Sequence, residues 1–136
     1  MISNEIKVRV RYGETDRMGY AHHSVYALYF EEGRTELLRE FGMDYKSMED
    51  NGYILPMASL SVEYIKPAKY DDLLTVKTIL KEKPGVRLTF EYEVYGPDGG
   101  MVCRALGKMV FANKATGRPC RPYPEFVKLV DKVFQV

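Results

Sequence analysis

One acidic residue of this 136-residue chain stands where it could act on an acyl compound. Asp16 lies in a stretch without hydrophobic periodicity, and it is followed by Gly19 and by the adjacent His22 and His23. A carboxylate can attack an acyl carbon as a nucleophile, or it can activate water as a general base. The pair Thr15-Asp16 before a glycine is also common turn chemistry, so the residue types alone leave the role of Asp16 open.

The elements on either side of this loop give the carboxylate its setting. Residues 6–12 alternate between apolar and polar side chains, which predicts a half-buried strand with Tyr12 on its apolar face. Residues 26–41 carry apolar side chains at helical spacing, with Ser24 as the expected N-cap and Gly42 as the stop signal. Unpaired N–H groups at a helix start favour negative charge and would polarise a carbonyl oxygen. The arrangement predicts an acyl-transfer site made from one carboxylate and a helix N-terminus.

The same helix carries a glycine on its apolar face. Gly33 costs about 1 kcal/mol relative to alanine inside a helix, so we expect the helix backbone to pack closely on a neighbouring surface. The polar residues of the helix are expected on its solvent side, and these are Glu31, Glu32, Arg34 and Arg39.

The rest of the chain is predicted to form a sheet. Runs of β-branched and aromatic residues between turn sequences indicate four strands, at 54–65, 73–81, 86–95 and 101–113. The short turns between the last three strands predict an antiparallel meander. Apolar residues at helical spacing after Pro124 predict a short C-terminal helix. The expected fold class is therefore α+β, with about five strands around one long helix.

Composition narrows the function classes. The length fits a single domain over residues 1–136. With 20 basic and 19 acidic residues, the chain lacks the basic excess typical of nucleic-acid binding. The sequence has no apolar signal segment and no run of about 18 apolar residues, so we expect a cytoplasmic protein without an integral membrane segment. Two histidines with Cys103 and Cys120 are too few for a zinc site, and we expect no metal and a buried free thiol at Cys103.

Two segments resemble a known protein family. Segment 12–31 begins with Tyr-x-x-Thr-Asp, which ends at Asp16. A glycine follows three residues after the aspartate (Gly19), a histidine seven after it (His23) and a tyrosine three residues later (Tyr26), and the segment ends with Phe30-Glu31. Segment 64–72 reads Tyr-x-x-Pro-Ala-x-x-x-Asp. Both are similar to motifs of the 4-hydroxybenzoyl-CoA thioesterase-like family of hot-dog-fold acyl-CoA thioesterases. Ala21 departs from the pattern, because many members carry a bulkier aliphatic residue there, and this leaves the pocket shape open.

The resemblance implies a hot-dog fold, in which a curved antiparallel sheet wraps a long helix and pairs with a second copy through sheet edges. It implies a homodimer or a dimer of dimers. Asp16 would be the catalytic carboxylate, either attacking the thioester carbonyl or activating water. Backbone N–H groups near His23 would polarise that carbonyl, and the His23 side chain would orient the loop or contact the substrate.

The substrate implied by the resemblance is an acyl-CoA, and no further cofactor is expected. The residues expected to bind the acyl part or support the pocket are Tyr12, Thr15, Gly19, Tyr20, His22, Tyr26 and Ser59. The basic residues expected to hold the phosphates of coenzyme A are Lys66, Lys69, Lys83 and Arg87. Two other functions stay open, a non-catalytic subunit that binds acyl-CoA or acyl carrier protein, and a hot-dog dehydratase. The length and the aromatic or aliphatic nature of the acyl group also stay open.

Overall fold

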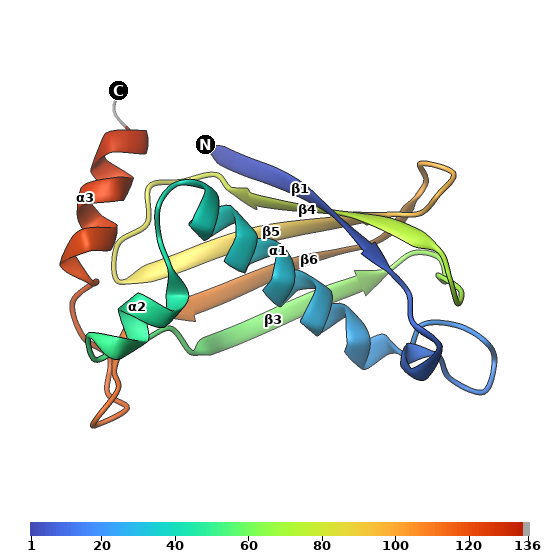
Figure 1. Ribbon diagram of the computed structural model, residues 1–136, viewed down its shortest axis with the longest axis horizontal. Coiled ribbons are helices and arrows are strands. Elements are labelled where there is room, and N and C mark those ends of the chain that lie inside the picture. Colours follow the sequence, from blue (N-terminus) through green and yellow to red (C-terminus); the bar gives the residue numbers. More distant parts are fainter. Residues whose placement is uncertain (135–136) are drawn as a thin grey trace.

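A five-stranded antiparallel sheet with the long helix α1 across one face forms the body of the protein (Figure 1). The computed structural model describes residues 1–134. The sheet strands, in spatial order, are β1 (Ile2–Arg9), β4 (Leu73–Leu80), β5 (Arg87–Tyr95), β6 (Met101–Val110) and β3 (Met57–Tyr64). The helices are α1 (Tyr26–Glu40), α2 (Tyr45–Asp50) and α3 (Pro124–Val133). Two single-turn helices, η1 (Tyr12–Glu14) and η2 (His23–Val25), precede α1, and β2 (Tyr53–Ile54) pairs with β7 (Ala112–Asn113) in a separate ribbon.

The strand order confirms the predicted architecture. β4, β5 and β6 form the expected antiparallel meander, β1 joins it beside β4, and β3 joins it beside β6. The α+β class, the sheet of five strands, the long helix and the short C-terminal helix are all as predicted. The predicted domain spans residues 1–136, of which the last two lie outside the described residues.

The two ends of the sheet carry different parts of the chain. β1, β3 and β5 finish at one end, where β4 and β6 begin, and the loop between β1 and α1 lies at this end (Figure 1). We call it the loop end and the opposite end the far end. An isolated bridge between Tyr20 and Lys69 ties that loop to the β3–β4 connection.

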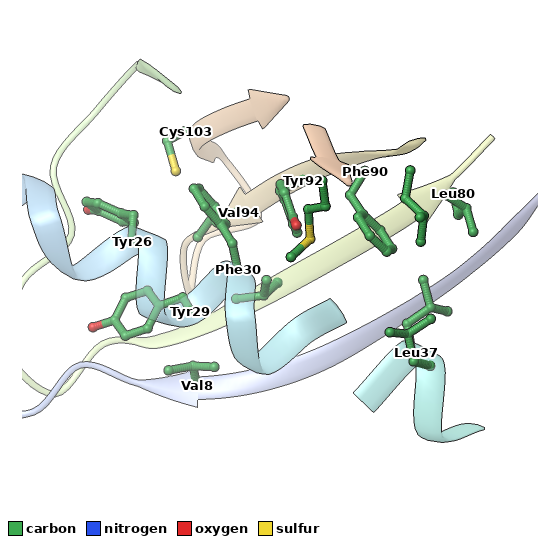
Figure 2. Close-up of a cluster of buried hydrophobic side chains, with 14 of the residues drawn as sticks. Val8, Tyr26, Tyr29, Phe30, Leu37, Leu80, Phe90, Tyr92, Val94 and Cys103 are labelled. Atoms are coloured by element: carbon green, nitrogen blue, oxygen red, sulfur yellow. The ribbon is translucent and has the colours of Figure 1, made fainter. Parts of the chain in front are cut away.

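The core lies between α1 and the inner face of the sheet. Phe30 of α1 stacks on Tyr92 of β5 with ring centroids 4.6 Å apart, and both side chains are buried (Figure 2). The alternation predicted for β5 is confirmed from Leu88 onward, because its apolar side chains point inward. At Gly33 a Cβ atom would collide with Oγ1 of Thr78 on β4, so the helix backbone packs on the sheet as predicted.

The first strand ends earlier than predicted. β1 stops at Arg9, and Tyr12 starts η1 with its side chain 75% exposed instead of sharing the buried face of Val8 and Val10. The physical reason is local, because the Glu14 carboxylate accepts the backbone N–H of Arg11 and closes a helical turn there.

Two expectations about α1 are also wrong. Ser24 is not the N-cap, because η2 precedes α1 and the ring of His22 accepts the Ser24 N–H instead. Arg34 is not on the solvent side, and its side chain is only 11% exposed. It follows Phe30 by four residues, so it lies on the same side of the helix, where its guanidinium lies beside the hydroxyl of Tyr92.

Two of the predicted strands are divided, and one short helix was not predicted. The expected strand 54–65 is divided at Pro56 into β2 and β3, and 101–113 is divided at Phe111 into β6 and β7. Helix α2 was not predicted, because its six residues are too few to establish a helical period. Its N-cap is Asp44, whose side chain accepts the Lys46 N–H.

Candidate active site

The loop between β1 and α1 holds Asp16 in a tight turn. The N–H of Asp16 donates to the carbonyl of Tyr20 at 2.8 Å, and the N–H of Gly19 donates to the carbonyl of Asp16 at 3.0 Å. Gly19 has a φ of +82°, in the left-handed region that favours glycine. The glycine three residues after the aspartate is therefore explained by the turn itself.

The half-buried carboxylate of Asp16 is fixed through one oxygen. Oδ1 accepts the N–H of Met18 at 2.9 Å and the N–H of Tyr20 at 3.2 Å. Within residues 1–134 no protein group donates a hydrogen bond to Oδ2. Backbone bonds to one oxygen orient the group, and the second oxygen is left to act on a substrate or on water.

The helix start supplies a backbone donor. The N–H of Val25 turns back to the carbonyl of His22 at 2.9 Å, and the N–H of Ser24 turns back to the His22 ring. In the described part of the chain, no protein acceptor receives the N–H of His23. This N–H group is in the position that the sequence analysis gave to the donor for the thioester carbonyl, and that role stays a prediction.

A second carboxylate, which the sequence analysis did not select, ties the loop to α1. Oε1 of Glu14 accepts the Arg11 N–H at 2.9 Å and the Tyr29 hydroxyl at 2.8 Å, and Oε2 accepts the Arg11 guanidinium at 2.8 Å. Burial alone would raise the pKa of Glu14, but the hydrogen bonds from Arg11 and Tyr29 outweigh it and lower that pKa. Burial and the bond to Glu14 raise the pKa of Tyr29. The signal available in the sequence was the spacing of Arg11 and Glu14, three residues apart.

Aromatic side chains support the other side of the helix start. The hydroxyl of Tyr64 donates to the carbonyl of His23 at 3.0 Å. The ring of Tyr26 packs edge-on against Tyr64 and Tyr29, with centroids 5.7 Å apart in each pair. Burial raises the pKa of Tyr26 to about 12 and that of Cys103 to about 12, so both stay protonated near neutral pH. Cys103 is a buried free thiol, as predicted.

The residues expected to bind the acyl part fall into two groups. Most lie in the same segment as Asp16, between the end of β1 and the first turn of α1, and they are Thr15, Gly19, Tyr20, His22 and Tyr26. Tyr12 is exposed and packs on Tyr70 instead, with ring centroids 5.5 Å apart. Ser59 lies near the far end of β3 and is exposed. The protomer does not bring Ser59 to Asp16.

The basic residues expected to bind phosphate are divided between the two ends of the sheet. Lys69 and Lys66 lie at the loop end, where Lys66 forms an ion pair with Asp98 at 2.7 Å. Lys83 and Arg87 lie at the far end and, with Lys81, line a hollow of about 210 Å³. At about 3.3 Å per residue, β5 separates these two ends by roughly 26 Å.

Among residues 1–134, no three His, Cys, Asp or Glu side chains come together as ligands for a metal ion. No helix in that range is both long enough and apolar enough to cross a membrane.

A long helix packed on an antiparallel sheet, with an acidic loop at the helix start, defines the class of hot-dog enzymes that the motifs indicated. The model of the Thioesterase-like superfamily matches residues 10–130, and the chain belongs to this family. The predicted family, fold and enzyme class, a thioesterase, are therefore confirmed.

Individual relatives agree with this assignment. The chain is 31% identical over 113 residues to YneP of Bacillus subtilis (strain 168), named as a candidate acyl-CoA thioesterase, covering 83% of this chain and 82% of YneP. It is 29% identical over 98 residues to the acyl-CoA thioester hydrolase YbgC of Escherichia coli O157:H7, covering 72% and 73% of the two chains. The structure of a DHNA-CoA thioesterase from Staphylococcus aureus superposes with a TM-score of 0.92 at 29% identity, covering 98% of this chain and 91% of that one.

Proposed function

We propose that this protein hydrolyses acyl-CoA thioesters, with Asp16 as the group that attacks the acyl carbon or activates water. The proposal depends on two features of the segment that leads into α1. One oxygen of Asp16 is held by two backbone N–H groups, and the N–H of His23 has no protein acceptor in the described residues. A carboxylate and a preorganised oxyanion donor are the minimum that thioester hydrolysis needs.

The reaction needs only these groups and water. The thioester oxygen accepts the N–H of His23, which stabilises the negative charge that develops on it. In the nucleophilic route Oδ2 of Asp16 adds to the acyl carbon, the C–S bond breaks, and water then cleaves the mixed anhydride. In the general-base route Asp16 takes a proton from water, and the resulting hydroxide adds to the acyl carbon. The C–S bond then breaks, and Asp16 gives the proton to the leaving sulfur. In both routes coenzyme A leaves with a proton on sulfur and the acyl group becomes a free acid.

A second copy of the chain would complete the coenzyme A site. β3 is an edge strand of the sheet, and unpaired strand edges favour pairing between identical chains. Antiparallel pairing of two β3 strands puts the far end of one copy beside the loop end of the other. Lys83 and Arg87 of one protomer would then approach the Asp16 loop of the other, where the phosphates of coenzyme A would lie. The homodimer, and the dimer of dimers that the resemblance also implies, belong to this proposal.

The proposed substrate class is a small acyl-CoA or an aromatic acyl-CoA. The named relatives support it, because YbgC is an acyl-CoA thioester hydrolase and the Staphylococcus aureus protein acts on the aromatic DHNA-CoA.

The test is the release of free thiol from a panel of acyl-CoA esters. Asp16→Asn should lower kcat by about 100-fold or more, since it removes the base or nucleophile. Asp44→Asn is the matched control, because Asp44 caps α2 away from the loop, and its rate should stay within about twofold of the wild type. Equal rates for wild type and Asp16→Asn would refute the role of Asp16. Tight acyl-CoA binding without hydrolysis would favour a binding subunit, and hydration of an enoyl-CoA would favour a dehydratase.

A further inference from the structure

The Asp16 loop leads into the helix start, and hydrolysis needs the Asp16 carboxylate and the His23 N–H group at a fixed distance from each other. The hydrogen bonds of Asp16 itself all fall inside the loop, to Met18, Gly19 and Tyr20. These bonds fix the shape of the turn but do not fix its distance from α1. Another contact must hold the turn against the helix.

Glu14 makes two such contacts, one through its side chain and one through its backbone carbonyl. Its side chain accepts the hydroxyl of Tyr29, which lies in the first turn of α1, at 2.8 Å. Its backbone carbonyl accepts the N–H of His22, the residue that precedes η2, also at 2.8 Å. One residue thus links the strand side of the loop to the helix and to the segment that leads into it. The Glu14 side chain is 11% exposed, so water competes little for these bonds.

The contacts of Tyr29 continue around the helix start. Its ring is buried and packs edge-on against Tyr26, which packs on Tyr64, whose hydroxyl holds the carbonyl of His23 (Figure 2 labels Tyr26 and Tyr29). The chain of contacts therefore runs from Glu14, two residues before Asp16, to the carbonyl of His23, the residue whose own N–H group is unused.

We propose that Glu14 and Tyr29 are positioning residues, whose hydrogen bond holds the Asp16 carboxylate at a fixed distance from the N–H donor of the helix start. This inference rests on the proposed function for its catalytic consequence, while the structural link can be tested without turnover. Neither side chain touches the acyl group or water in the reaction. A displacement of about 1 Å between reacting groups costs up to about 100-fold in rate, so loss of the link should appear in kcat.

Tyr29→Phe removes the linking hydroxyl and keeps the buried ring. Hydrogen exchange at the backbone N–H groups of Tyr20 and His22 should become about fivefold faster, and kcat should fall about tenfold with KM within about twofold of the wild type. Tyr45→Phe is the matched control, because its half-buried hydroxyl also donates one hydrogen bond, to the carbonyl of Leu55 at 3.2 Å. This control should leave both the loop exchange and kcat within about twofold of the wild type.

A double-mutant cycle tests whether the two residues act as one pair. Glu14→Ala should lower kcat at least as much as Tyr29→Phe, because it also frees Arg11, and adding Tyr29→Phe to it should cause no further loss. Unchanged loop exchange in Tyr29→Phe would overturn the inference whether or not the enzyme turns over. Faster exchange with an unchanged kcat, or equal losses in Tyr29→Phe and Tyr45→Phe, would also overturn it. A wild-type rate in Asp16→Asn would instead refute the proposed function, and the exchange data would still decide the link.

Discussion

Substitution of Gly33 tests how closely α1 packs on the sheet. A Cβ atom at this position would collide with Oγ1 of Thr78 and would lie 3.3 Å from Cγ1 of Val76. Overpacking of a rigid core costs about 1–3 kcal/mol, while alanine in place of glycine favours the helix by about 1 kcal/mol. Gly33→Ala should therefore lower the free energy of unfolding by up to about 2 kcal/mol, although alanine is the better helix former.

A substitution at Thr78 separates the cost of overpacking from the gain in helix propensity. Its Oγ1 is buried and has no hydrogen-bond partner among residues 1–134, so Thr78→Ala removes the obstruction at a small cost. The double variant should recover about 1 kcal/mol relative to the sum of the single effects. Gly85→Ala is the control, because nothing lies within 4 Å of a Cβ there and its φ is not positive.

Chemical unfolding followed by circular dichroism measures the stability of the wild type and of the four variants. Gly33→Ala should be less stable than the wild type, Gly85→Ala should be almost unchanged, and the double variant should recover stability. If Gly33→Ala were as stable as the wild type, the helix backbone would lie further from β4 than the structure places it.

Two further predictions concern the core and the loop. Phe30→Ala removes a buried ring stacked on Tyr92 and should cost about 3–5 kcal/mol of unfolding free energy, measured by the same assay, whereas a loss below about 1 kcal/mol would contradict this packing. The pKa of Glu14 is lowered in the folded state, so its contribution to stability is present above its ordinary pKa of 4.5 and is lost as pH falls through the folded-state value. Glu14→Gln should therefore flatten the acid side of the stability profile, and an unchanged profile would contradict the hydrogen bonds assigned to this carboxylate.

The fold was predictable because most of its signals are local. The alternation of β5 from Leu88 onward, the helical spacing after Tyr26 and the short turns of the meander depend on residues close in sequence. Gly33 also allowed one tertiary contact to be predicted. A glycine destabilises the interior of a helix, and its presence there indicated that α1 packs closely against the sheet. Where the local signal misled, a specific side-chain bond was responsible, as at Tyr12, where Glu14 closes η1 on Arg11.

The site was predictable only in its sequence-local part. Asp16, Gly19 and His23 lie within a few residues of one another, so the motif places them together. The contact of Tyr64 with the His23 carbonyl joins residues 41 positions apart, and no periodicity indicates it. The bond from Tyr29 to Glu14 spans 15 positions and joins a helix to a loop. Such pairs depend on how the elements pack, and only the folded chain reveals them.

The groups proposed for the reaction explain why the sequence signal is so short. Every residue except proline has a backbone N–H group, so the donor does not require a particular residue type. Asp16 is therefore the one side chain whose chemistry the motif must specify. The turn then requires Gly19, because its φ of +82° is costly for other residues. The reaction also requires a fixed distance between the Asp16 carboxylate and the N–H donor. We propose that hydrogen bonds and aromatic packing of Glu14, Tyr29 and Tyr64 maintain this distance. Other pairs of side chains would serve equally well to fix this distance in a relative. Glu14, Tyr29 and Tyr64 should therefore vary together among related sequences, while Asp16 and Gly19 should stay the same.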